Sequence, residues 1–168
     1  MLFSYRILTV ILVIFAERGE MNQKACFFIG HSDASERVAP AVFSAIERLI
    51  SEYEVDQFYV GGYGSFDRIV TAELQRAKVL HPGIKLYLVL PYHPAERPFL
   101  LPAGFDGSIY PFDVAPPRKY AIIRANELMI RECGYLIAYA KYVGKARDFT
   151  EYARKHGAAV FNIAEEVE

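Results

Sequence analysis

The sequence contains few cysteines and no excess of charge of either sign. Among 168 residues there are 2 Cys, and 19 Lys plus Arg stand against 20 Asp plus Glu. A protein that binds a nucleic-acid backbone normally carries a basic surface, so this balance argues against a DNA or RNA partner. Cys26 and Cys133 lie in separate apolar runs, with no CxxC pair and no histidine at zinc-ligand spacing. We therefore expect two buried, reduced thiols and a cytoplasmic protein.

Several catalytic and cofactor-binding patterns are also missing. The sequence offers no Ser-His-Asp set, no paired carboxylates and no metal-ligand cluster. Its one glycine-rich segment has neither the spacing of the dinucleotide fingerprint nor the lysine of a Walker A loop. We predict no metal and no cofactor, and the residues alone reveal no catalytic mechanism.

The chain length fits a single domain with a short N-terminal extension. Residues 2–16 form an apolar stretch interrupted by Arg6, and Met21 stands directly before the first convincing strand. We assign residues 1–20 to an extension and residues 21–168 to the domain, for which we expect no membrane association. A leader or anchor is the alternative for residues 1–20, although the stretch is shorter than the roughly 20 residues of a spanning helix and lacks a good cleavage site. An additional structural element is the third alternative.

Short apolar runs and amphipathic segments alternate along the rest of the sequence. Apolar runs bounded by turn residues indicate buried strands, and apolar residues at three- and four-residue steps indicate helices. We predict strands at 24–29, 57–60, 84–90, 108–110, 135–140 and 159–163, and helices at 38–53, 65–79, 117–132 and 146–156. This order predicts a three-layer α/β fold with a mainly parallel sheet of five to six strands, joined by right-handed crossovers.

The strongest functional signal is the segment Gly61-Gly62-Tyr63-Gly64-Ser65, which follows a predicted strand and opens a predicted helix. In parallel sheets ligands bind beyond the carboxyl ends of the strands. Glycines let main-chain amides converge on an anion at the positive end of a helix dipole, so a phosphate fits there. Ser65 either donates its hydroxyl to that phosphate or only caps the helix. Asp67 either accepts a hydrogen bond from a ribose hydroxyl or base or only stabilises the helix start.

Further candidates follow the other strands at the same edge. After the first strand, Gly30 and His31 precede Ser32, and His31 either binds phosphate, transfers a proton or is an ordinary turn residue. Ser32 or Asp33 is equally suited to capping the next helix. After the third strand, Tyr92 can stack on a base with His93 in contact, or both merely shape the loop.

The second half of the chain contributes basic residues and one asparagine as further candidates. Arg118, Lys119 and Arg124 surround the start of a predicted helix, and Asn126 stands in its middle, where asparagine is a poor helix former. Gly144 and Lys145 follow the fifth predicted strand and form another turn suited to an anion. A solvated surface is the alternative for the charged residues, and the high content of Tyr and Phe is compatible with a homo-oligomer.

Taken together, the glycine loop of residues 61–67, the segment 124–129 and the strand 135–139 resemble the SLOG superfamily, and within it the YpsA-like bacterial branch. The resemblance covers residues 24–163. It implies a Rossmann-like fold that binds nucleotides or nucleotide-derived ligands. The residues that match the family's motifs are Gly61, Gly62, Gly64, Ser65, Asp67 and Asn126.

The sequence also departs from this family at three points. The enzymatic LOG branch has a catalytic glutamate three residues after the Ser/Thr, where this chain has Arg68. Ala125 separates Arg124 from Asn126, and the later glycine pair is reduced to Gly144-Lys145. We expect a domain that binds or senses a nucleotide-like small molecule. The alternatives are an N-glycosidic hydrolase of a nucleotide derivative and, less favoured by the charge balance, DNA handling as in DprA.

Overall fold

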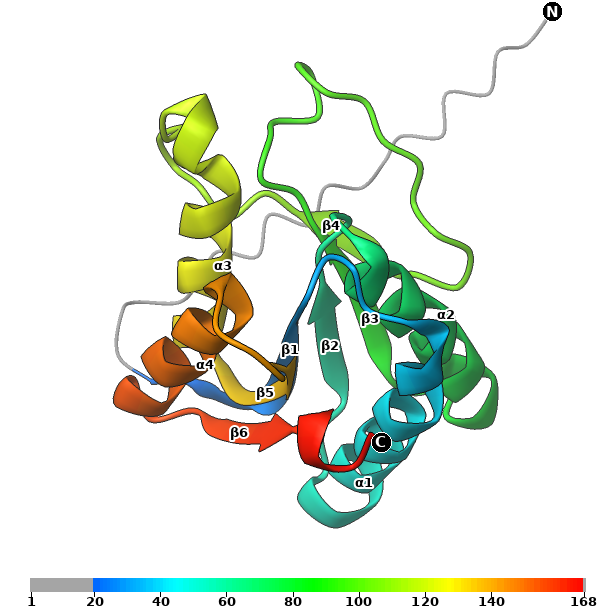
Figure 1. Ribbon diagram of the computed structural model, residues 1–168. Coiled ribbons are helices and arrows are strands. Elements are labelled where there is room, and N and C mark those ends of the chain that lie inside the picture. The colour runs from blue at the N-terminus through cyan, green and yellow to red at the C-terminus, as the bar shows by residue number, and fades with distance from the viewer. Residues whose placement is uncertain (1–19, 168) are drawn as a thin grey trace, which may run out of the picture.

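The computed structural model describes residues 20–167, which form one sheet flanked by helices (Figure 1). The strands are β1 (Asn22–Gly30), β2 (Gln57–Val60), β3 (Lys85–Val89), β4 (Gly107–Ile109), β5 (Cys133–Tyr139) and β6 (Ala159–Asn162). The α-helices are α1 (Ala39–Tyr53), α2 (Ser65–Leu80), α3 (Ala121–Glu132) and α4 (Lys145–Lys155). Short 3-10 helices stand at η1 (Glu36–Val38), η2 (Arg118–Tyr120) and η3 (Ile163–Glu165).

All six strands are parallel and stand in the order β4-β3-β2-β1-β5-β6. The chain builds outward from β1 to β4 on one side, then returns to add β5 and β6 on the other side of β1. The direction of winding therefore reverses between β1 and β5, which makes this the topological switch point of the sheet. The predicted α/β fold with a parallel sheet is confirmed.

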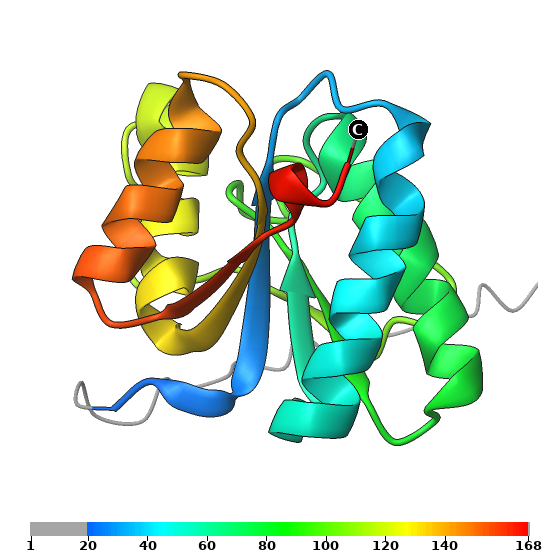
Figure 2. The same cartoon turned by 60° about the horizontal axis from the view of Figure 1, so that its bottom comes forward.

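Helices cover both faces of the sheet and complete three layers. Figure 2 shows α1 and α2, cyan and green, on one face and α3 and α4, yellow and orange, on the other. Alternate residues of β1 point to opposite faces: Cys26 and Phe28 pack with α1 and α2, whereas Phe27 and Ile29 pack with α3 and α4. The sheet is thus buried on both sides, as its continuous apolar strands indicate.

Both cysteines are free thiols in the core, as predicted. Cys26 and Cys133 are fully buried. Cys26 packs on the face of the sheet that α1 and α2 cover, and Cys133 on the face that α3 and α4 cover. Burial raises the pKa of both thiols above the ordinary value. They therefore remain protonated and pack as small apolar side chains.

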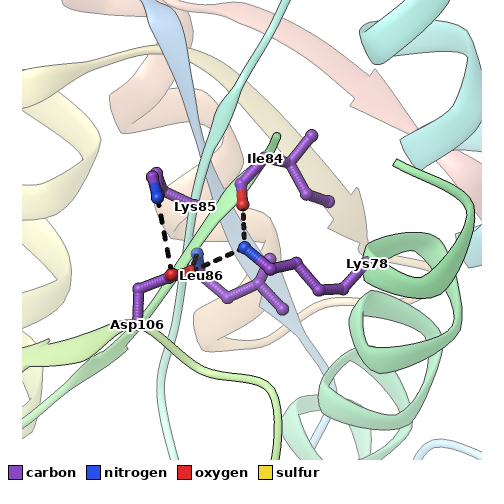
Figure 3. A network of polar contacts seen from close by, with 5 residues as sticks. All are labelled: Lys78, Ile84, Lys85, Leu86 and Asp106. Atoms are coloured by element: carbon purple, nitrogen blue, oxygen red, sulfur yellow. Dashed lines mark hydrogen bonds and ion pairs between the residues drawn. The ribbon is translucent and has the colours of Figure 1, made fainter. Parts of the chain in front are cut away.

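The connection from β3 to β4 runs through a long loop, residues 90–106, without an α-helix (Figure 1). Its far end is anchored by Asp106, whose Oδ2 accepts hydrogen bonds from the Leu86 amide at 2.9 Å and from Lys78 at 3.0 Å (Figure 3). Lys78 also donates to the carbonyl oxygen of Ile84, and Lys85 lies 3.7 Å from Asp106 Oδ1. This network ties the edge strand β4 to the end of α2 and the beginning of β3.

Within residues 20–167 no helix is long and apolar enough to cross a membrane. The predictions made for the apolar stretch at residues 2–16 fall on positions outside the described part of the chain.

Candidate functional site

Three adjoining hollows lie at the carboxyl ends of the central strands. The switch-point hollow, about 510 Å³, lies beyond β1 between the starts of α2, α3 and α4 and includes His31, Asn126 and Lys145. The loop hollow, about 470 Å³, lies beyond β2 and β3 under the 90–106 loop and includes Tyr92 and Arg97. Between them is the floor hollow, about 70 Å³, which shares Asn126 with the first and Asp67 with the second. The shared lining residues make the three hollows neighbours along the carboxyl edge.

The loop after β2 is shaped by a glycine that no other residue can replace easily. Gly64 has a φ of 98°, and a Cβ at this position would lie 2.9 Å from Cα of Ser32. The adjacent Ser65 amide donates a hydrogen bond to the Ser32 carbonyl oxygen at 2.8 Å. The loops after β1 and β2 are therefore in direct backbone contact, and the Ser65 amide is not available to a ligand.

Asp67 stands where the floor and loop hollows meet. Its Oδ2 accepts a hydrogen bond from the Tyr63 amide at 3.0 Å. The same oxygen lies 2.8 Å from the position that a Cβ on Gly61 would occupy, so only glycine leaves room for the carboxylate. Burial raises the pKa of Asp67 to about 7, although the bond from Tyr63 acts in the opposite direction. Near neutral pH the charged and the neutral forms of this carboxyl group are therefore both populated.

His31 joins the loop after β1 to the loop after β5. Its Nε2 accepts hydrogen bonds from the amides of Lys141 at 2.9 Å and Tyr142 at 3.4 Å, which places the proton of the neutral ring on Nδ1. Burial lowers the pKa of His31, with Asp33 acting in the opposite direction. The ring is therefore neutral at pH 7, holds the two loops together and forms part of the wall of the switch-point hollow.

The charged side chains that line the switch-point hollow are lysines. Lys119 and Lys145 line it, and no Asp or Glu among the described residues does so. The N-cap residues of α2 and α4 are Gly64 and Gly144, and no described side chain caps either helix start. Gly64 and the first two residues of α4 lie at this hollow. Two helix dipoles and two lysines therefore favour an anion there.

The structure brings together most of the residues proposed from the sequence. The predicted residues that line one or more of the three hollows are Gly30, His31, Ser32, Gly61, Gly62, Gly64, Asp67, Tyr92, Lys119, Asn126 and Lys145. Ser65, His93, Arg118, Arg124 and Gly144 do not line them. Ser65 is the first residue of α2, and Gly144 is the N-cap of α4. His93 Nδ1 accepts from the Ala95 amide, and Arg124 forms a 3.0 Å ion pair with Glu127 along α3.

The capping alternatives proposed from the sequence are wrong. Ser65 does not cap α2, because the N-cap position is Gly64. Neither Ser32 nor Asp33 caps the next helix: Ser35 Oγ accepts from the Arg37 amide at the start of η1. Ser32 and Asp33 make other contacts: the Ser32 carbonyl oxygen accepts from the Ser65 amide, and Asp33 accepts a hydrogen bond from Tyr142.

Sequence reasoning missed Tyr63 and Arg97 as site residues. Arg97 Nη1 lies 3.3 Å from the Tyr63 hydroxyl, and its guanidinium carbon lies 4.2 Å from the ring centroid of Tyr92. Tyr63 was visible inside the glycine loop, whereas nothing in the proline-rich segment distinguished Arg97 from a solvated side chain. Arg68, at the position of the LOG glutamate, forms a 3.2 Å ion pair with Glu36.

Fold and site together define a three-layer parallel α/β domain with adjoining hollows at the carboxyl edge of its sheet, one of them at the switch point. No protein-family model matches the chain, and no curated protein is found to be similar to it. Within the described residues no group of three or more His, Cys, Asp or Glu is arranged to hold a metal ion.

Proposed function

We propose that this domain binds or senses a nucleotide or nucleotide-derived ligand at the carboxyl edge of its sheet. The observation that carries the proposal is the switch-point hollow, which is lined by Lys119 and Lys145 at the N-terminal ends of α3 and α4 and by no described Asp or Glu. Its volume of about 510 Å³ falls within the usual range for small-molecule sites. The proposal includes membership of the SLOG superfamily. It also includes a cytoplasmic location, which is consistent with the two free thiols of the protein.

The groups around the floor hollow suit the sugar of such a ligand. Asp67 is an acceptor when ionised, and Asn126 offers both a donor and an acceptor. They lie between the lysine-lined switch-point hollow and the mainly apolar loop hollow. A phosphate on the lysine side would place its ribose hydroxyls near the carboxyl and amide groups.

The proposal is tested by calorimetric titration of the full chain with adenosine 5′-monophosphate. We expect Lys145→Gln and Lys119→Gln each to weaken binding by about tenfold, since a charge-assisted hydrogen bond contributes roughly 1.5–3 kcal/mol. Lys155→Gln is the matched control, because Lys155 is exposed in the last turn of the same helix as Lys145. Its affinity should equal that of the unmodified chain.

Mass spectrometry of small molecules released from the purified full chain provides an independent test. A nucleotide or nucleotide derivative in stoichiometric amount is the expected result. If no such molecule co-purifies and a panel of nucleoside monophosphates gives no heat at millimolar concentration, the proposal is wrong.

Hydrolysis of a nucleotide is the second candidate, and Asp67 is the observation that favours it. A carboxyl group with a pKa of about 7 at the junction of two hollows is suited to giving or taking a proton at neutral pH. Incubation with adenosine 5′-monophosphate, followed by chromatography for free adenine, tests this activity. Adenine release that Asp67→Asn abolishes would favour the enzyme, whereas binding without release favours the sensor.

A further inference from the structure

The loop hollow has walls of a different character from those of the switch-point hollow. Hydrocarbon side chains from the end of β3 and from the 90–106 loop make up most of its lining, namely Leu88, Leu90, Pro98, Phe99, Leu100 and Pro102. Its charged groups are Asp67 next to the floor hollow and the guanidinium groups of Arg68 and Arg97. Such a slot suits a flat, largely apolar group better than a second phosphate.

Tyr63 and Tyr92 are held in place along this hollow by Arg97. The two rings meet edge to face, with 6.2 Å between centroids and 69° between planes. The Arg97 guanidinium lies over the ring of Tyr92 and donates a hydrogen bond to the hydroxyl of Tyr63. The amide of Arg97 in turn donates to the carbonyl oxygen of His93 at 3.0 Å, which fixes the turn that carries it. Tyr63, Tyr92 and Arg97 therefore contact one another along the loop hollow.

The loop hollow adjoins the site proposed for the phosphate and sugar. Gly61, Tyr63 and Asp67 line both the loop hollow and the floor hollow, and Gly30 and Asn126 line both the floor hollow and the switch-point hollow. A ligand with an anion at one end can thus pass over Asn126 and Asp67 and reach the aromatic residues at the other end. A nucleoside monophosphate has this order of groups.

We propose that the loop hollow is the base subsite, in which the heteroaromatic base of a nucleoside monophosphate stacks against Tyr92, while its phosphate lies at Lys119 and Lys145. This inference rests on the proposed function and specifies its ligand class. A sugar phosphate without a base leaves the loop hollow empty. The base contributes stacking to the affinity, typically about tenfold or more per aromatic contact.

The first experiment compares adenosine 5′-monophosphate with ribose 5-phosphate by calorimetry on the full chain. We expect the nucleotide to bind at least about tenfold more tightly. Tyr92→Ala should remove most of that difference without changing the affinity for ribose 5-phosphate, and Tyr92→Phe should restore it. Tyr53→Ala is the matched control, since Tyr53 is a partly exposed tyrosine at the opposite end of the sheet, in the last turn of α1. It should leave both affinities unchanged.

A second variant gives a direct signal from the subsite. The chain contains no tryptophan, so Tyr92→Trp installs a single indole at the loop hollow. We expect adenosine 5′-monophosphate to quench its fluorescence on stacking, and ribose 5-phosphate to leave it unchanged at saturation. This variant keeps a large aromatic ring and therefore also serves if Tyr92→Ala fails to fold.

The outcomes separate the two proposals. If nucleotide and sugar phosphate bind equally, or if the nucleotide binds without quenching the indole, the base subsite is wrong while the phosphate site stands. If neither ligand binds, or if Lys145→Gln has no effect, the proposed function itself fails, and the base subsite fails with it.

Discussion

The imidazole of His31 lies parallel to the phenol ring of Tyr142, with 3.8 Å between ring centroids and 6° between ring planes. The hydroxyl of Tyr142 donates a 2.6 Å hydrogen bond to Asp33. These contacts add to the bonds that His31 Nε2 accepts from the amides of Lys141 and Tyr142. The β1–α1 and β5–α4 loops are thereby joined across the switch point.

Replacing His31 should therefore destabilise the fold. We expect His31→Ala to lower the free energy of unfolding by about 2–4 kcal/mol, because it leaves two partly buried amides without their acceptor and removes a stacked ring. Tyr142→Phe keeps the stack and loses only the solvent-exposed bond to Asp33, so it should lower the free energy of unfolding by less than His31→Ala does. Urea unfolding measures both values. Equal losses in the two variants would show that the Nε2 acceptor has no special role.

Asp67 should make stability depend on pH in an unusual direction. Its pKa is raised to about 7 in the folded chain from an ordinary value of 3.8, so the folded state holds the proton more tightly. The stability that this proton contributes is present below about pH 4 and is lost as the pH rises towards 7. Asp67→Asn keeps an oxygen for the Tyr63 amide and removes the charge. The variant should therefore gain stability relative to the unmodified chain between pH 4 and pH 7.

The measurement is urea unfolding of both proteins at several pH values from 4 to 8. We expect a gain of about 1–3 kcal/mol at pH 8, since one pKa unit corresponds to about 1.4 kcal/mol and partial exposure reduces the full shift. Asp113→Asn, at an exposed loop position, is the control. A difference between Asp67→Asn and the unmodified chain that stays constant with pH would contradict the assigned titration. An acid retained at a cost in stability is typical of a functional site.

Three glycine-to-alanine substitutions separate backbone strain from steric contact. At Gly64 both effects act, because φ is 98° and the new Cβ would meet Ser32. At Gly104 φ is 79° but nothing lies within 4 Å of the new Cβ, and at Gly83 neither problem exists. We expect the free energy of unfolding to fall by about 2–4 kcal/mol in Gly64→Ala and by about 1–2 kcal/mol in Gly104→Ala. In Gly83→Ala it should fall by less than about 0.5 kcal/mol.

Thermal and urea unfolding give these three values. Gly64→Ala should also weaken ligand binding, because it pushes apart the loops that border the switch-point hollow. A Gly64→Ala variant as stable as Gly83→Ala would show that the close contact with Ser32 does not exist in solution.

Asp106 should control the stability of the edge strand β4. Burial alone would raise its pKa, but the hydrogen bonds from the Leu86 amide and Lys78, with the charge of Lys85, hold the pKa below the ordinary value. The stability from this lowered pKa is present above about pH 4 and is lost as the pH falls below it. Asp106→Ala should lower the free energy of unfolding by about 1–3 kcal/mol. Asp106→Asn should lower it by less, because Asn still accepts the hydrogen bond from the Leu86 amide.

Hydrogen exchange locates the effect of the Asp106 variants. The Leu90 amide donates to the Ile109 carbonyl oxygen beside β4, so its exchange should become faster in Asp106→Ala. Lys85→Gln is the control for charge alone and should have a small effect, because its nitrogen is 3.7 Å from the carboxylate. Unchanged exchange at Leu90 together with a normal unfolding curve would contradict this role for Asp106.

The order of strands and helices could be predicted because it depends on local patterns. Apolar runs such as residues 57–60 and 135–139 are driven out of water and into the core. The apolar residues of segment 39–53 recur at helical spacing, so they form one apolar face of a helix. The position of β5 beside β1 was not predicted, since no residue pattern specifies which strands pair. The glycine loop could be recognised because glycines between a strand and a helix indicate a tight turn or a close backbone approach.

The partners of individual polar side chains could not be predicted. Ser32, Asp33 and Ser65 have equal capping ability by sequence, yet Ser32 and Ser65 meet through their backbones and Asp33 accepts a hydrogen bond from Tyr142. Arg97 donates a hydrogen bond to Tyr63, which lies 34 positions away in the chain. Such contacts join residues far apart in sequence, and local preference says nothing about them.

The sequence by itself determined that this chain forms a layered α/β domain with a glycine loop at a strand end, because burial of apolar residues and backbone freedom are properties of short segments. Only the tertiary structure decided which charges share a cavity. It brought Lys119 and Lys145 to one hollow and Asp67 to the next, which raised the pKa of that acid through burial. Electrostatic environment depends on distances through space, and these exist only once the sheet has assembled.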